Sequence, residues 1–186
     1  MRVKVLDQLH KFIKNIPKGA LLFLVKALFF YLIWICAYHF YFQPKQLLDP
    51  PLTNSLTILT FKIVRPIYTG HVVTLSYHTA APMILVDGMY NLKILDGCNA
   101  LELYVFYIGF IICYGGSLKT SLQFILAGLV GIFILNLIRC VVLSVLSFNH
   151  FRYIDSMHHY VFTIVVYSFI LTLWFYFFKV SLKVRR

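Results

Sequence analysis

The sequence predicts an all-α polytopic membrane protein: a bundle of at least four transmembrane helices, with an amphipathic helix and a small β-hairpin on its outer face. Of the 186 residues, 61% are hydrophobic and only 12% are charged, whereas a soluble domain carries about 25% charged residues. The mean hydropathy is +0.83. This balance also excludes a disordered chain, which combines low hydrophobicity with high net charge. Lipid is therefore the expected solvent for most of the chain.

Four stretches approach the length of about 20 apolar residues that a helix needs to cross a bilayer. We expect a single membrane domain without repeats, in which the outer loop separates the first two spans. The segments are a cytoplasmic N-terminus (1–19), span 1 (20–42), an outer loop (43–97), span 2 (98–115), span 3 (119–148), span 4 (158–178) and a cytoplasmic tail (179–186).

The charges orient these spans. With both termini cytoplasmic, the inner side holds ten of the 17 basic residues and a single acid, Asp7. Short cytoplasmic loops collect Lys and Arg, so the net charge of +11 is explained by topology and we expect no nucleic-acid partner.

The outer loop contains two different patterns. Residues 51–66 place four apolar side chains on one helical face, between Pro51 and Pro66, and predict an amphipathic helix that lies on the outer leaflet or packs on the bundle. A membrane-spanning helix is the less favoured interpretation of 51–66, because the run is short and contains the charged residues Lys62 and Arg65. Residues 71–95 alternate with period two and predict a hairpin with Asp87-Gly88 as its turn.

Polar residues inside the spans are the candidates for function, because ionisable groups in a membrane are costly. Arg139 lies late in span 3, and Asn136 shares its helical face. Cys98 opens span 2 with Asp96 as a plausible cap, and a helix N-terminus favours the thiolate. Glu102, one turn later, is placed to hold Arg139 or a histidine.

His158 and His159 open span 4 from the outside. The topology brings this pair, Cys98 and Arg139 to the same depth on the same side, so that one site could hold a nucleophile, a base and a cation. The simpler alternatives are a buried packing cysteine and an arginine that reaches the interface or pairs with Asp155. We expect no cofactor and no metal, because the histidines have no recognised ligand spacing.

The ordered set Cys98-Asn99-Ala100, Asn136-x-x-Arg139 and a histidine heading the last span resembles the exosortase/archaeosortase family of membrane cysteine enzymes. The resemblance covers residues 70–179. Two positions depart from the family pattern: Ala100 stands where the family has Gly, and His159 stands where an acidic residue often follows the catalytic His. The family pattern fits His158 better than His159.

The resemblance implies a thiol peptidase or transpeptidase in a prokaryotic cytoplasmic membrane, with Cys98, Arg139 and His158 as the catalytic residues and His159, Asn136, Glu102 and Asn99 as supporting or alternative ones. Its partners would be the bilayer, secreted proteins that end in a motif, a hydrophobic span and basic residues, and an envelope glycan or lipid acceptor. The residues alone leave hydrolysis and transfer both open. One alternative is a non-enzymatic scaffold or assembly partner for envelope export. A small transporter is a further alternative, but it fits less well because the polar residues gather at one face of the membrane instead of crossing its midplane.

Overall fold

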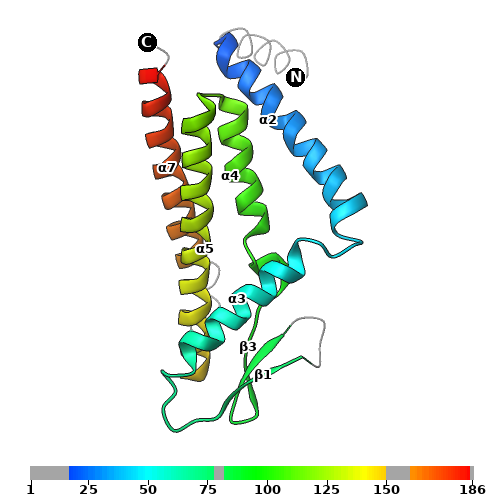
Figure 1. The fold of residues 1–186 in the computed structure, drawn as a ribbon, viewed down its shortest axis with the longest axis vertical. Coiled ribbons are helices and arrows are strands. Elements are labelled where there is room, and N and C mark those ends of the chain that lie inside the picture. The colour runs from blue at the N-terminus through cyan, green and yellow to red at the C-terminus, as the bar shows by residue number, and fades with distance from the viewer. Residues whose placement is uncertain (1–16, 78–81, 150–159, 185–186) are drawn as a thin grey trace, which may run out of the picture.

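The computed structural model describes residues 17–77, 82–149 and 160–184, and it is mostly helical (Figure 1). Long helices carry the chain between the two ends of the molecule, and a shorter helix and a small sheet lie at one end. In chain order the elements are α2 (Lys18–Ala37), the π-helical turn η1 (Tyr38–Phe42), α3 (Asp49–Val64), β1 (Val73–Ser76), β2 (Met83–Val86), β3 (Met89–Lys93), the 3₁₀ turn η2 (Asp96–Cys98), α4 (Leu101–Tyr114), α5 (Leu118–Phe148) and α7 (Phe162–Val184).

Within the described residues, three helices are long and apolar enough to cross a membrane: Lys18–Phe42, Leu118–Phe148 and Phe162–Lys183. They correspond to the predicted spans 1, 3 and 4. The stretch predicted as span 2 contains α4, which is apolar but has only 14 residues. The chain is therefore a membrane protein with three candidate spans and a shorter apolar helix.

Close contacts at glycines join the long helices. A Cβ on Gly128 of α5 would lie 2.0 Å from the ring of Tyr107 on α4, and one on Gly131 would lie 2.2 Å from Phe169 of α7. Gly109 of α4 meets a ring of α2 in the same way. Small residues allow helix backbones to approach closely where lipid supplies no hydrophobic driving force. The core of the bundle consequently lies between α4, α5 and α7, around Tyr107, Ile111, Ile132, Ile170 and Phe177.

The sheet is antiparallel, in the order β1-β2-β3. Asp87 and Gly88, which connect β2 and β3, both have positive φ (52° and 78°), the conformation that two-residue connections need to match strand twist. The stretch predicted as a hairpin over 71–95 is a three-stranded sheet, in which β1 pairs with β2 along its full length. One face of the sheet packs with the end of α3 and the last turns of α5, around Val64, Tyr68, Val73, Ile84 and Val86.

The long helices separate two ends of the molecule. The start of α2, the α4–α5 connection and the end of α7 lie at one end, whereas α3 and the sheet lie at the other (Figure 1). The first end carries Lys18, Lys119, Lys179 and Lys183. The distribution matches the charge asymmetry on which the sequence prediction of topology rests.

Helix α3 differs from the amphipathic helix predicted over 51–66. It begins two residues earlier, at Asp49, and its buried stripe is largely polar: Asp49, Thr53, Leu56, Thr57, Thr60 and Val64. Ile63, from the predicted apolar face, is 40% exposed. A threonine can be buried on a helix because its hydroxyl bonds the preceding turn, and Thr57 does so to the carbonyl of Thr53 (2.8 Å). The polar face of α3 thereby packs toward α5 and η2.

Candidate functional site

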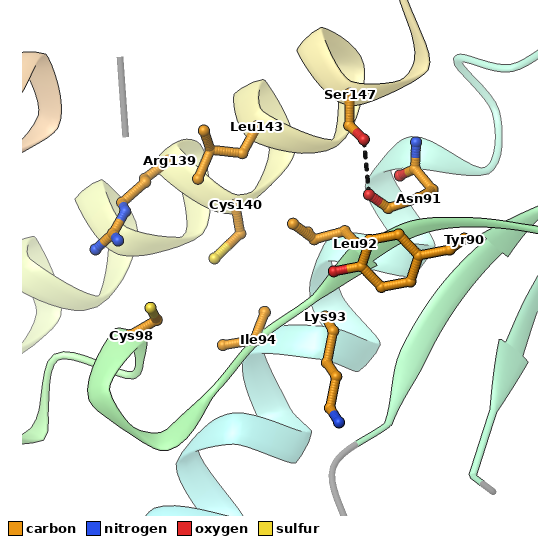
Figure 2. A pocket seen from close by; sticks show the side chains of 10 residues that line it. All are labelled: Tyr90, Asn91, Leu92, Lys93, Ile94, Cys98, Arg139, Cys140, Leu143 and Ser147. Carbon is orange, nitrogen blue, oxygen red and sulfur yellow. Dashed lines mark hydrogen bonds between the residues drawn. The ribbon is translucent and has the colours of Figure 1, made fainter. Parts of the chain in front are cut away.

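A pocket of about 340 Å³ opens between α5, β3 and the end of η2, a volume suited to a small-molecule or side-chain ligand. Cys98 and Arg139, both predicted as site residues, line it. In Figure 2 Arg139 and Cys140 project from α5 toward the turn that carries Cys98. The full lining is Tyr90, Asn91, Leu92, Lys93, Ile94, Cys98, Arg139, Cys140, Leu143 and Ser147.

The sequence predicts Cys98 at the head of a helix, and the structure corrects this position. Cys98 ends the 3₁₀ turn η2, and α4 begins three residues later at Leu101, with Ala100 rather than Asp96 in the capping position. Ala100 has φ 66° and ψ 15°, in the left-handed region, which glycine, and to a lesser degree Asn and Asp, adopts readily but alanine does not. The helix therefore starts late because the chain turns sharply between Cys98 and Leu101.

Two asparagines hold this turn. Asn136 of α5, 3% exposed, donates a hydrogen bond from Nδ2 to the carbonyl oxygen of Cys98 (3.1 Å). Asn99, 1% exposed, accepts a bond at Oδ1 from the Leu101 amide (2.9 Å) and thus satisfies a free N–H of α4. Asn136 shares a helical face with Arg139, yet its hydrogen bond goes to the backbone of the cysteine.

The wall opposite Cys98 is strand β3, and a bulge fixes it to α5. The register slips between Ile84 and Leu85, which leaves Asn91 as the extra residue of β3. Its amide donates to the carbonyl of Ser144 (3.1 Å), and its own carbonyl accepts from Ser147 (2.8 Å). A bulge commonly re-aims a side chain beside a site. Here it directs Asn91 away from the ladder and joins the strand to the pocket's helical wall.

The pocket is cationic. Arg139 and Lys93 both contribute to its lining, and none of the described residues that line it is acidic. Lys93 extends away from Cys98, so Arg139 is the cation on the side of the thiol (Figure 2). A guanidinium presents a planar fork of donors that suits a carboxylate, a phosphate or a developing oxyanion.

The other predicted site residues lie elsewhere. Glu102 is exposed in the first turn of α4 and does not line the pocket. His158, His159 and Asp155 fall in the stretch 150–159, outside the described residues. The structure therefore joins the predicted nucleophile and cation and leaves the predicted base as an expectation.

Two residues of this region were not singled out from the sequence. Cys140 follows Arg139 and lines the same pocket, and it is 4% exposed. Asp49 is a buried acid at the start of α3 that accepts a hydrogen bond from Asn99 (2.8 Å). Its position directly before Pro50-Pro51, at a helix start, was the available signal, because an acid there is favoured by the helix dipole.

Comparison with known proteins finds no match to a family model, a curated protein or a solved structure.

Proposed function

We propose that this chain is a membrane-embedded cysteine peptidase or transpeptidase. It would cleave the C-terminal sorting signal of secreted proteins at the outer face of the membrane and pass them to an envelope acceptor or to water. The observation that carries the proposal is the pocket that contains both the thiol of Cys98 and the guanidinium of Arg139. The resemblance to exosortases and archaeosortases supports the same assignment of roles.

The chemistry follows from the residue types. The Cys98 thiolate would attack a peptide carbonyl, forming a C–S bond and a tetrahedral oxyanion that Arg139 stabilises. Collapse of this tetrahedral intermediate would break the C–N bond of the substrate, with His158 donating a proton to the leaving amine. Water or an amine would then attack the thioester, give its proton to the histidine and release the thiolate. The incoming nucleophile decides between peptidase and transpeptidase.

The membrane arrangement belongs to the same proposal. We infer that α4 completes a fourth span, with both termini cytoplasmic and the pocket on the outer side. Its 14 residues rise about 21 Å, less than the ~30 Å hydrocarbon core. The turn that carries Cys98 would then lie within the outer leaflet, close to where a substrate's own hydrophobic span emerges.

The test follows a tagged secreted protein that ends in a hydrophobic span and basic residues, coexpressed with each variant. Cys98→Ala and Cys98→Ser should abolish loss of the tail. Arg139→Ala should slow it by about 10²–10³-fold, the usual cost of removing an oxyanion donor, and His158→Ala should block it where His159→Ala does not.

Cys36→Ala is the matched control, since Cys36 is an exposed cysteine of α2 that does not line the pocket. It should leave processing unchanged. Normal processing by Cys98→Ala would refute the enzyme and favour the non-enzymatic scaffold, in which Cys98 is a packing residue.

A further inference from the structure

A chain of hydrogen bonds connects the cysteine turn to two elements outside the pocket. Asp49, the first residue of α3, is 7% exposed. Its Oδ1 accepts from Asn99 Nδ2 and its Oδ2 accepts from the Tyr38 hydroxyl, both at 2.8 Å. Asn99 in turn accepts the Leu101 amide. The route therefore runs from η1 through α3 to the first amide of α4.

The burial of Asp49 needs an explanation. A carboxylate removed from water costs several kcal/mol unless hydrogen bonds satisfy its oxygens. Here each oxygen has a partner, and one of them is the residue directly after Cys98. An apolar side chain would fill the same space without that cost. An apolar residue at position 49 could not accept the hydrogen bond from Asn99, and this bond is therefore the feature that a buried acid adds.

The turn itself needs to be held. Ala100 has φ 66°, and a strained backbone persists only where its surroundings over-determine it. Asn136 holds the Cys98 carbonyl from α5, and Asp49 holds the Asn99 side chain from α3. We propose that Asp49 is a positioning residue for Cys98 that acts through Asn99 and fixes the thiol opposite Arg139. Its effect on turnover rests on the proposed function, whereas its effect on thiol reactivity does not.

Exchanging the two side chains tests the proposal. Asn99→Asp alone sets two carboxylates against each other where a hydrogen bond of 2.8 Å now stands. The double variant Asp49→Asn with Asn99→Asp restores the three bonds of this chain: the new amide at 49 donates to the carboxylate at 99 and accepts from Tyr38, and that carboxylate accepts the Leu101 amide. Asn54→Asp is the matched control, the same change at an exposed position of α3.

Two readouts are used on the full-length chain in membranes. The first is alkylation of Cys98 by an uncharged maleimide, followed by mass spectrometry of its peptide. Asn99→Asp should raise the rate about tenfold because the half-buried thiol is released from its turn. The second is turnover of the tagged substrate, where kcat should fall about 100-fold with little change in KM, as for a misplaced catalytic group. The exchange variant should return both to near the wild-type values.

The outcomes are separable. Wild-type alkylation in folded Asn99→Asp overturns the proposal, and so does an exchange variant that retains the defect of the single variant or fails to fold. If Asn99→Asp does not fold, recovery of folding and of slow alkylation in the exchange variant supports it. Normal processing by Cys98→Ala refutes the proposed function alone, because alkylation still reports whether Asp49 holds the turn.

Discussion

Ala100 is the residue at which the backbone departs furthest from ordinary geometry within the candidate site. Its left-handed conformation (φ 66°, ψ 15°) costs an alanine roughly 1–2 kcal/mol. We expect Ala100→Gly to raise the free energy of unfolding by about 0.5–1 kcal/mol, the balance left after the extra entropy that glycine loses on folding. Denaturant titration in detergent micelles measures the change.

An Ala→Gly substitution in the middle of a helix should instead lower the free energy of unfolding. Ala127 is exposed in the interior of helix α5, where glycine costs about 0.5–1 kcal/mol. Ala127→Gly is therefore the matched control. If Ala100→Gly destabilised the protein as Ala127→Gly does, packing of the methyl group would outweigh the backbone strain at this turn.

Asp87 gives the sheet a defined response to acid. Hydrogen bonds from His71 and from the Val72 amide lower the pKa of its carboxyl below the usual 3.8. Since the folded pKa is depressed, the stabilisation is present above 3.8 and is lost as the pH falls through the folded pKa. Exchange of the Val72 amide, corrected for its intrinsic rate, should consequently accelerate only below about pH 4.

Asp87→Asn is the control for this acid response. Asparagine tolerates positive φ and its amide oxygen accepts the Val72 N–H at every pH. The corrected exchange rate should then be independent of pH, and an acid response that survived in this variant would assign it to another group.

At the scale of elements, the contact between α4 and α5 depends on Gly128. The ring of Tyr107 lies where a Cβ would stand, is fully buried, and is held by its hydroxyl donating to the Phe124 carbonyl (2.7 Å). The ring cannot move away without losing that bond. We expect Gly128→Ala to lower the free energy of unfolding by about 1–3 kcal/mol, the usual cost of overpacking.

Gly19→Ala provides the comparison, because nothing lies within 4 Å of its Cβ position at the start of α2. Its effect should be below about 0.5 kcal/mol. Thermal unfolding of both variants in the same detergent decides the matter: equal midpoints would mean that α4 and α5 separate at this point without cost.

The elements that the sequence located best are those with an unbroken apolar pattern. Helix α5 was expected over 119–148 and runs from Leu118 to Phe148. The start of α4 is predicted at Cys98 and lies at Leu101, because the intervening turn depends on a left-handed alanine that no local pattern demands. The buried face of α3 was predicted only in part: Leu56 of the expected apolar face is buried, but so are Thr53, Thr57 and Thr60, which hydrophobicity alone assigns to solvent.

At the scale of the molecule, counting residues along the spans placed Cys98 and Arg139 together, because helix rise converts sequence position into depth. The role of Asp49 could not be found in that way. It meets Asn99 across 50 positions of sequence, and only the tertiary path of α3 brings them together. Depth along a membrane helix is thus readable from sequence, whereas contacts across the bundle are not.

The orientation of the whole molecule is the remaining prediction. Lysines gather at the end that holds the α4–α5 connection, and the positive-inside rule assigns that end to the cytoplasm. In a chain with Cys36 and Cys98 replaced by alanine, Met89→Cys marks the sheet and Ser117→Cys marks the connection, both at exposed positions. An impermeant maleimide applied to intact cells should label only the cysteine at 89.

Permeabilisation makes this comparison internally controlled. The cysteine at 117 should become reactive once the membrane is opened, which shows that its earlier protection came from the bilayer and not from burial. The reverse pattern would place the pocket in the cytoplasm, where secreted proteins do not present their cleaved ends. It would therefore refute the proposed substrates while leaving the geometry of Cys98, Asn99 and Asp49 untouched.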